Sequence, residues 1–181
     1  MLPVGLTMLT HAIFTTPRLE GRRPDAADGP GVRALLLHPE VQVWLRPAPL
    51  PAFEARDADT LLQTDQEHWV RHGFGPLSLR DRVTGEYVGR GGLARATVLG
   101  RPAVELPWAV VPARHNEGLA TEAARAAIEW AWDLDLPEVV SFALKGNAAS
   151  RRVMDKAGLT FDRDLKRAGL PHVLYRATRP R

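Results

Sequence analysis

The stretch from Val104 to Ala124 restricts the fold more than any other part of the chain. It reads VELPWAVVPARHNEGLATEAA, a strand-like apolar run that passes through a short polar loop into the first turns of a helix. Pro107 lies inside the strand-like run, and because proline has no backbone N–H it belongs at a bulge or at an edge. The stretch therefore predicts a strand that is distorted midway, followed at once by a helix.

That helix is amphipathic, which predicts a sheet beside it. Leu119, Ala123, Ala127, Ala131 and Leu134 recur at helical spacing. Apolar periodicity and turn residues along the rest of the chain predict strands over 13–22, 75–81, 87–94, 103–111, 139–144 and 170–178, and helices over 25–37, 57–72, 118–134 and 148–157. The order of these elements predicts an α/β or α+β layout with one mixed, mostly antiparallel sheet.

Length and hydropathy indicate one domain. A chain of 181 residues is long enough to bury a sizeable core, and the Pro-rich stretch 45–52 is too short to separate two domains, so we expect residues 1–181 to form a single domain. No stretch approaches the ~20 apolar residues that a membrane-spanning helix requires, and residues 1–12 lack the pattern of a secretory signal. We expect a soluble, cytoplasmic protein, no membrane contact, and a frayed extension over residues 1–12.

Residue usage excludes several kinds of chemistry. The chain has no cysteine, so disulfides, thiolate metal sites and a cysteine nucleophile are excluded. His68 and His72 lie four residues apart on an expected helix, but no third ligand accompanies them, and we expect no metal. The arginines are scattered along the chain and the tryptophans fall in expected core runs, which argues against a nucleic-acid partner.

The loop that opens the helix at Gly118 has the features of an anion site. The first backbone amides of a helix have no partner within the helix, the helix dipole is positive there, and small residues such as Gly118 and Ala120 allow a phosphate to come close. The alternative is an ordinary strand-to-helix connection with a flexible glycine, since such turns are frequent. Spacing alone leaves both readings open.

Motifs along nearly the whole chain resemble the GCN5-related N-acetyltransferase (GNAT) family. Residues 115–120 (HNEGLA) resemble its Gln/Arg-x-x-Gly-x-Gly/Ala loop, and residues 147–150 (NAAS) with 156–159 (KAGL) resemble its second signature, Asn-x-x-Ser followed by Lys-x-Gly-Phe/Leu. Residues 16–19 (TPRL) and 84–86 (TGE) resemble the branch that contains the ribosomal-protein N-terminal acetyltransferases. The resemblance implies a soluble acyltransferase that binds acetyl-CoA and moves the acetyl group onto an amine.

The resemblance also implies where acetyl-CoA binds. The loop amides would hold the pyrophosphate, two residues of the distorted fourth strand would pair with the pantetheine arm, and the start of the 148–157 helix would contact that arm. A bulge at Pro107 would splay this strand from strand 139–144 and leave a slot for the thioester. The expected cofactor-binding residues are Val110, Val111, His115, Asn116, Glu117, Gly118, Leu119, Ala120, Thr121, Asn147 and Ser150. For Asn147 the alternative is a helix cap, and both roles can coexist.

Two positions depart from the family pattern. His115 stands where the loop usually begins with glutamine or arginine, so Arg114 is a candidate to supply the missing phosphate contact. Met154 stands where many members have a tyrosine, and a thioether cannot donate a proton. Both departures support the main alternative to an enzyme, which is a CoA-binding regulatory or interaction module without catalysis.

Transfer to an amine requires a neutral nitrogen, and an alkyl amine with a pKa near ~10 is almost fully protonated at neutral pH. Glu105 lies on the distorted strand, where partial burial would raise the pKa of its carboxyl group, so it is the first candidate for the base. The alternative is a structural glutamate paired with an arginine. Ser150 is the hydroxyl best placed to act as an acid toward the leaving thiolate, and a serine that stabilises the helix start is its alternative.

The acceptor and the oligomeric state are less constrained. The acceptor is expected to be a protein N-terminal amine or a small-molecule amine, with specificity in the loop 43–56. A homodimer is conceivable through an exposed Trp44 or through a strand edge near Leu174.

Overall fold

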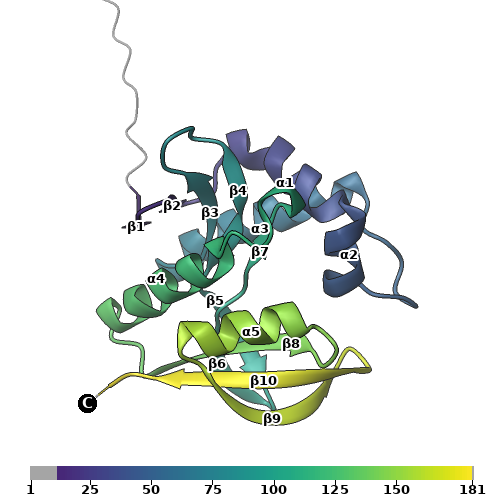
Figure 1. Cartoon of the computed structure of the whole chain (residues 1–181), viewed down its shortest axis with the longest axis vertical. Helices are drawn as coiled ribbons and strands as arrows, with labels where there is room; N and C mark the ends of the chain where they lie inside the picture. Colours follow the sequence, from purple (N-terminus) through teal and green to yellow (C-terminus); the bar gives the residue numbers. More distant parts are fainter. Residues whose placement is uncertain (1–11, 181) are drawn as a thin grey trace, which may run out of the picture.

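The computed structural model describes residues 12–180. The expected extension over residues 1–12 therefore lies, apart from Ala12, outside the described residues. Among the described residues, no helix is both long enough and apolar enough to span a bilayer. A hairpin and three helices are followed by five consecutive strands and then by a helix–strand–helix–hairpin segment, and the strands form two five-stranded sheets (Figure 1).

The first sheet has the strand order β1-β2-β3-β4-β7, with every neighbouring pair antiparallel. Its strands are β1 Phe14–Thr15, β2 Leu19–Arg22, β3 Pro76–Asp81, β4 Tyr87–Gly92 and β7 Ala109–Val110.

The second sheet has the order β5-β6-β8-β10-β9 and is mixed, because β6 runs parallel to β8 whereas the other pairs are antiparallel. Its strands are β5 Ala94–Val98, β6 Arg101–Glu105, β8 Glu138–Leu144, β9 Thr160–Arg167 and β10 Leu170–Thr178. The α/β fold and the splayed fourth strand expected from the sequence are confirmed.

The division between the sheets occurs in the strand that contains Pro107. β6 ends at Glu105, the residues Leu106 to Trp108 are irregular, and β7 begins at Ala109 in the other sheet. Leu106 is 0% exposed, its amide donates to the Val140 carbonyl at 2.7 Å, and its own carbonyl accepts from Ser141 Oγ at 2.9 Å. The expected distortion at Pro107 is therefore large enough that one expected sheet becomes two.

Helix α4, Leu119–Asp133, lies across both sheets and holds them together (Figure 1). Near its start, Leu119 and Ala123 pack with Val88 and Val110 of the first sheet. Further along, a second group on the same helix packs in the larger core cluster over the second sheet, together with α5, Ala148–Ala157. Of the expected apolar positions, Leu119, Ala123, Ala127 and Ala131 are buried. The expectation for Leu134 is wrong, because the helix ends at Asp133 and the Leu134 side chain is 38% exposed.

Two helices, α1 Gly29–Leu37 and α3 Ala55–His72, pack together beside the first sheet. Arg90 of β4 binds Asp65 of α3 through two hydrogen bonds of 2.6 and 2.7 Å, and the Asp65 side chain is buried. A buried carboxylate needs such a partner, since an unpaired buried charge is costly. This ion pair fixes α3 against the sheet. The remaining helical segments are the short helix α2, Pro39–Leu45, and two 3-10 turns at Ala26–Asp28 and Pro112–Arg114.

Some expected elements have different bounds in the structure. The strand over 13–22 divides into a β1–β2 hairpin because the chain turns back at Pro17, and the strand over 87–94 ends at Gly92, after which β5 joins the other sheet. The helix α2 and the strand β9 were not expected. β9 lacks the usual apolar alternation because most of its side chains are exposed, and α2 is short and leads into the Pro-rich stretch.

The prediction that a strand edge lies near Leu174 is wrong. β10 lies between β8 and β9, and Leu174 is fully buried. The edge position belongs to β9 instead, because that strand pairs only with β10. Trp44, the other residue considered for a dimer contact, is exposed as expected.

Substitution of Gly89 tests how closely β4 and β7 approach. A Cβ atom built at Gly89 would lie 2.2 Å from the Ala109 carbonyl oxygen, so Gly89→Ala must push β7 away from β4. We expect a loss of unfolding free energy of about 1–3 kcal/mol, the usual cost of overpacking. Urea denaturation measures it. Gly146→Ala is the control, because nothing lies within 4 Å of its Cβ position. Equal midpoints for the two variants would contradict the close approach.

Candidate active site

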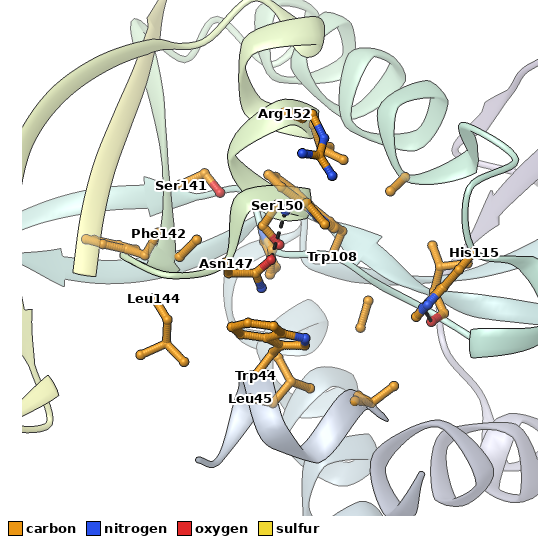
Figure 2. Close-up of a pocket in the computed structure, with 18 of the residues that line it drawn as sticks. Trp44, Leu45, Trp108, His115, Ser141, Phe142, Leu144, Asn147, Ser150 and Arg152 are labelled. Carbon is orange, nitrogen blue, oxygen red and sulfur yellow. Dashed lines mark hydrogen bonds between the residues drawn. The ribbon is translucent and has the colours of Figure 1, made fainter. Parts of the chain in front are cut away.

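A cavity of about 710 Å³ lies where the two sheets separate. Its walls come from the irregular segment before β7, from β8, from the start of α4, from α5 and from α2 (Figure 2). In Figure 2, Trp44 and Leu45 of α2 enter from one side, Arg152 of α5 lies on the opposite side, and Trp108, Asn147 and Ser150 lie between them. The cavity is thus the direct product of the splay.

The backbone of Val110 is directed toward this opening. Val111 donates its amide to the Val88 carbonyl at 2.9 Å, and Val110 is the Cα partner of Gly89. Hydrogen-bonded and non-hydrogen-bonded pairs alternate in an antiparallel ladder, so the N–H and C=O groups of Val110 point away from β4. On the side where β8 has moved away, β7 consequently presents the Val110 amide, whereas the Val110 carbonyl is paired with His115 Nε2 at 2.8 Å.

The loop before α4 has the geometry expected for an anion site. Gly118 precedes the helix with φ of 81°, a conformation that glycine adopts without the strain imposed by a Cβ atom. Asn116, Gly118, Leu119, Ala120 and Thr121 line the cavity, and we call this part the loop end. The unpaired amides of a helix start and the positive end of its dipole are therefore available there.

A hydrogen-bond network fastens the loop end from behind. Arg18 donates to the Glu117 carbonyl at 2.7 Å and to Glu122 through Nε at 2.7 Å, and its backbone amide also donates to Glu122 at 2.9 Å. Thr16 donates its hydroxyl to the same carboxylate at 2.6 Å. Burial is the largest single effect on the pKa of Glu122 and opposes ionisation, but the hydrogen bonds from Thr16 and Arg18 together lower that pKa. Glu122 is thereby kept as an anion.

The two basic residues considered for the phosphate contact have protein partners. Arg114 binds Glu117 at 2.8 Å and Asp81 at 3.1 Å. Amides of Thr84 and Val83, with help from Arg114, lower the pKa of Asp81 to about 2. His115 Nε2 lies 2.8 Å from the Val110 carbonyl, and because a carbonyl can only accept, Nε2 carries the hydrogen. Arg114 therefore lines the cavity with a guanidinium that is already paired with two carboxylates, and it braces the loop.

Asn147 serves as a helix cap and also lines the cavity. Its side-chain oxygen accepts from the Ser150 amide at 3.0 Å, which is the capping interaction at the start of α5, and the side chain is buried (Figure 2). Ser150 lies in the first turn of α5 and also lines the cavity. For Asn147 the helix cap and the expected location at the site coexist. Ser150 also lies at the site, where its backbone amide receives the cap.

Glu105 lies in the cavity wall and is paired with an arginine. Arg167 of β9 reaches both of its carboxylate oxygens, each at 3.3 Å, and the Arg167 guanidinium carbon stands 4.4 Å from the centre of the Phe142 ring. The Glu105 side chain is 19% exposed. The partial burial expected for this carboxylate and the arginine partner named as its alternative are both present.

Most of the expected cofactor-binding residues come together in the cavity wall, but Val111 and Glu117 are not part of the lining. Val111 is turned toward β4 by its hydrogen bond to Val88, and the Glu117 side chain is turned toward Arg114. The expected residues that do line the cavity are Glu105, Val110, His115, Asn116, Gly118, Leu119, Ala120, Thr121, Asn147 and Ser150.

Several lining residues were missed from the sequence. Arg152 and Lys156 line the cavity from α5. Their spacing of four residues puts them on one helix face, which was the available signal. The β8 residues Phe142 and Leu144 also line it. Trp44 and Leu45 line it too, and they belong to the segment 43–56 in which acceptor specificity was expected. The sequence did not indicate that this segment begins as a helix beside β8.

Two other positions have structural roles. His68 accepts from the Arg95 amide through Nε2 at 2.8 Å and pairs through Nδ1 with the Phe74 carbonyl at 2.8 Å, so both of its ring nitrogens are occupied. Within residues 12–180 no group of three or more potential metal ligands is present. Met154 is fully buried in the main core cluster and does not line the cavity.

Comparison with known proteins supports the resemblance seen in the motifs. Residues 18–160 match the family model described as acetyltransferase (GNAT) domain. The curated protein YkkB of Bacillus subtilis (strain 168), described as uncharacterized, is 25% identical over 112 residues, which cover 61% of this chain and 65% of that protein. The chain thus spans somewhat less than two thirds of the length of this relative.

Solved structures extend the likeness to about nine tenths of the chain. An acetyltransferase from Agrobacterium tumefaciens str. C58 is 27% identical and superposes with a TM-score of 0.78. The superposition covers 92% of this chain and 94% of that one. RimL, a ribosomal L7/L12 alpha-N-protein acetyltransferase solved with coenzyme A, is 18% identical and covers 93% of this chain with 98% of its own at a TM-score of 0.74. The chain belongs to the acetyltransferase (GNAT) domain family.

Proposed function

We propose that the protein transfers an acetyl group from acetyl-CoA to a primary amine, with both substrates bound at once and no covalent enzyme intermediate. The observation that supports this most is the splay between β7 and β8, which leaves the Val110 amide facing a cavity that begins at the loop end. A pantetheine arm is an extended chain with amide groups, and it can pair with an exposed strand edge in the manner of an added strand.

The loop end suits the pyrophosphate of the cofactor. Backbone amides at the start of α4 would donate to phosphate oxygens, and Arg152 and Lys156 add positive charge from α5. Asn147 would contact the arm while it caps its own helix. Membership of the acetyltransferase (GNAT) domain family and the similarity to RimL, which was solved with coenzyme A, support this ligand.

The chemistry needs one proton acceptor and good positioning. The amine nitrogen attacks the thioester carbon, the C–N bond forms as the C–S bond breaks, and the proton lost by nitrogen ends on the CoA sulfur. Glu105 is our candidate to accept that proton, directly or through water, and Ser150 is our candidate to donate to the sulfur. The Val110 amide would polarise the carbonyl, and electrostatic stabilisation of this kind is often the largest contribution to catalysis.

A CoA-binding module without catalysis is the second candidate. Two observations favour it: Glu105 is already bound by Arg167, and the position of the usual tyrosine is occupied by the buried Met154.

Calorimetric titration with acetyl-CoA, free CoA and ATP, followed by thiol release with a panel of amines, separates the candidates. We expect micromolar binding of acetyl-CoA and CoA alone, with thiol release. Binding without thiol release would favour the module, and absence of CoA binding would contradict both.

Glu105→Gln tests the proton acceptor. The amide cannot take a proton, so we expect kcat to fall by about 10²-fold and its pH dependence to change, while the Kd for acetyl-CoA stays the same. Steady-state kinetics between pH 6 and 9 measure this. Glu67→Gln, an exposed change on α3, is the control. An unchanged pH profile would remove Glu105 from the mechanism.

Arg18→Ala tests the network behind the loop end. The variant loses the bonds to the Glu117 carbonyl and to Glu122, so the loop becomes less ordered before the cofactor binds. We expect the Kd for CoA to rise about tenfold, equivalent to about 1.4 kcal/mol, with kcat at saturating cofactor little changed. Titration calorimetry measures it. Arg56→Ala is the control, because Arg56 pairs with the exposed Glu54, and this variant should bind CoA like the parent protein. An equal rise in the Kd for CoA in Arg56→Ala would contradict a specific role of Arg18 at the loop end.

A further inference from the structure

The part of the cavity opposite Arg152 is lined by exposed apolar side chains. Trp44 and Leu45 of α2 and Leu50 beyond it are 45%, 46% and 40% exposed, and all three line the cavity. Large apolar side chains that gather at one concave place and stay partly exposed there are typical of a ligand site. We call this part, together with Phe142 and Leu144 across from it, the apolar end.

The wall across from α2 is one face of the second sheet. Side chains alternate between the two faces of a strand, so Phe142 and Leu144 of β8 lie on the same face. His172 of β10 is the Cα partner of Leu144 and therefore shares this face. Glu105 is the partner of Val140, which places it on the same face as well. Apolar side chains thus share one face of the sheet with the carboxylate proposed as the proton acceptor.

The charges at the apolar end favour a cation over an anion. Glu40 of α2 and Glu105 of β6 both line the cavity, and the one guanidinium at this end, Arg167, is bound to Glu105. His172 Nδ1 lies 2.9 Å from the Leu170 carbonyl, so this nitrogen carries its hydrogen in the neutral ring. Within residues 12–180, a ligand amine at this end therefore meets Glu40, a carboxylate that no arginine binds, whereas a ligand carboxylate meets only Arg167, which is already bound to Glu105.

We propose that the apolar end binds the acceptor, and that the acceptor is a small primary amine on a compact apolar body, such as an arylalkylamine. This rests on the proposed function and names its substrate class. The apolar body packs between the α2 side chains and β8, and the amine is directed toward Glu105 and the Val110 amide. A polyamine lacks the apolar body, and a peptide N-terminus adds backbone polar groups that these walls leave without partners.

Acceptor competition provides the test. Thiol release from acetyl-CoA is measured with 2-phenylethylamine, spermidine and a tetrapeptide with a free N-terminus. We expect kcat/KM for 2-phenylethylamine to exceed kcat/KM for spermidine and for the tetrapeptide by at least about tenfold.

Trp44→Ala and Leu45→Ser should each raise KM for 2-phenylethylamine about tenfold while the Kd for CoA stays the same. Val43→Ala is the matched control, because Val43 is 54% exposed on the same helix but does not line the cavity.

Each result decides between the proposals. If spermidine or the peptide is the better acceptor, or if Trp44→Ala and Leu45→Ser change KM no more than Val43→Ala does, the proposed acceptor class is wrong while acetyl transfer stands. If acetyl-CoA binds and no amine of any class releases thiol, the proposed enzyme function fails and the acceptor class fails with it. Thermal unfolding of each variant confirms that it is folded, and the exposed positions of these residues leave the core intact.

Discussion

The break in the chain between Glu105 and Ala109 is the constraint on which the rest of the structure depends. Up to Glu105 the strand belongs to the second sheet, and Leu106 still bonds to Val140 and Ser141. Pro107 cannot donate to a ladder, so the strand cannot continue along β8, and from Ala109 onward the chain pairs with β4 instead. Two sheets result from what the sequence alone describes as one strand. The edge of β7 that faces away from β4 then borders a cavity and not another strand.

Separated sheets need another element to join them, and α4 does this. Its small residues Ala123 and Ala127 let the helix lie close to both sheets, with Ala123 in the cluster of the first sheet and Ala127 in that of the second. The same helix begins at the loop end, so its position sets the distance between the proposed anion site and the opening between the sheets. Arg18 and Glu122 then tie the helix start to the N-terminal hairpin. Fold stability and cofactor geometry therefore depend on the same contacts.

The sequence allowed prediction of the features that follow from local pattern. The break at Pro107, the amphipathic α4 and the Asn147 cap each depend on residue types a few positions apart, and each is present. The features that were missed depend on partners distant in sequence. β9 is an edge strand whose exposed side chains carry no alternation, and the roles of Arg114 and Arg18 depend on Asp81 and Glu122, far along the chain. Charge pairs of this kind leave no periodic signal, because an arginine reads the same whether it binds a ligand or a loop.

The placement of α2 shows why the acceptor side was the hardest part to anticipate. The helix has seven residues, and Val43, Trp44 and Leu45 are all exposed on it. The sequence placed acceptor specificity in the segment 43–56 but did not show which of its side chains border the site. Only the fold shows that Trp44 and Leu45 line a cavity together with Phe142 and Leu144, whereas Val43 does not. An exposed tryptophan on a short helix thus has two physical explanations, a partner chain or a small ligand. The concave setting, with Glu105 in its wall, favours the small ligand, since a flat partner surface would not reach that carboxylate.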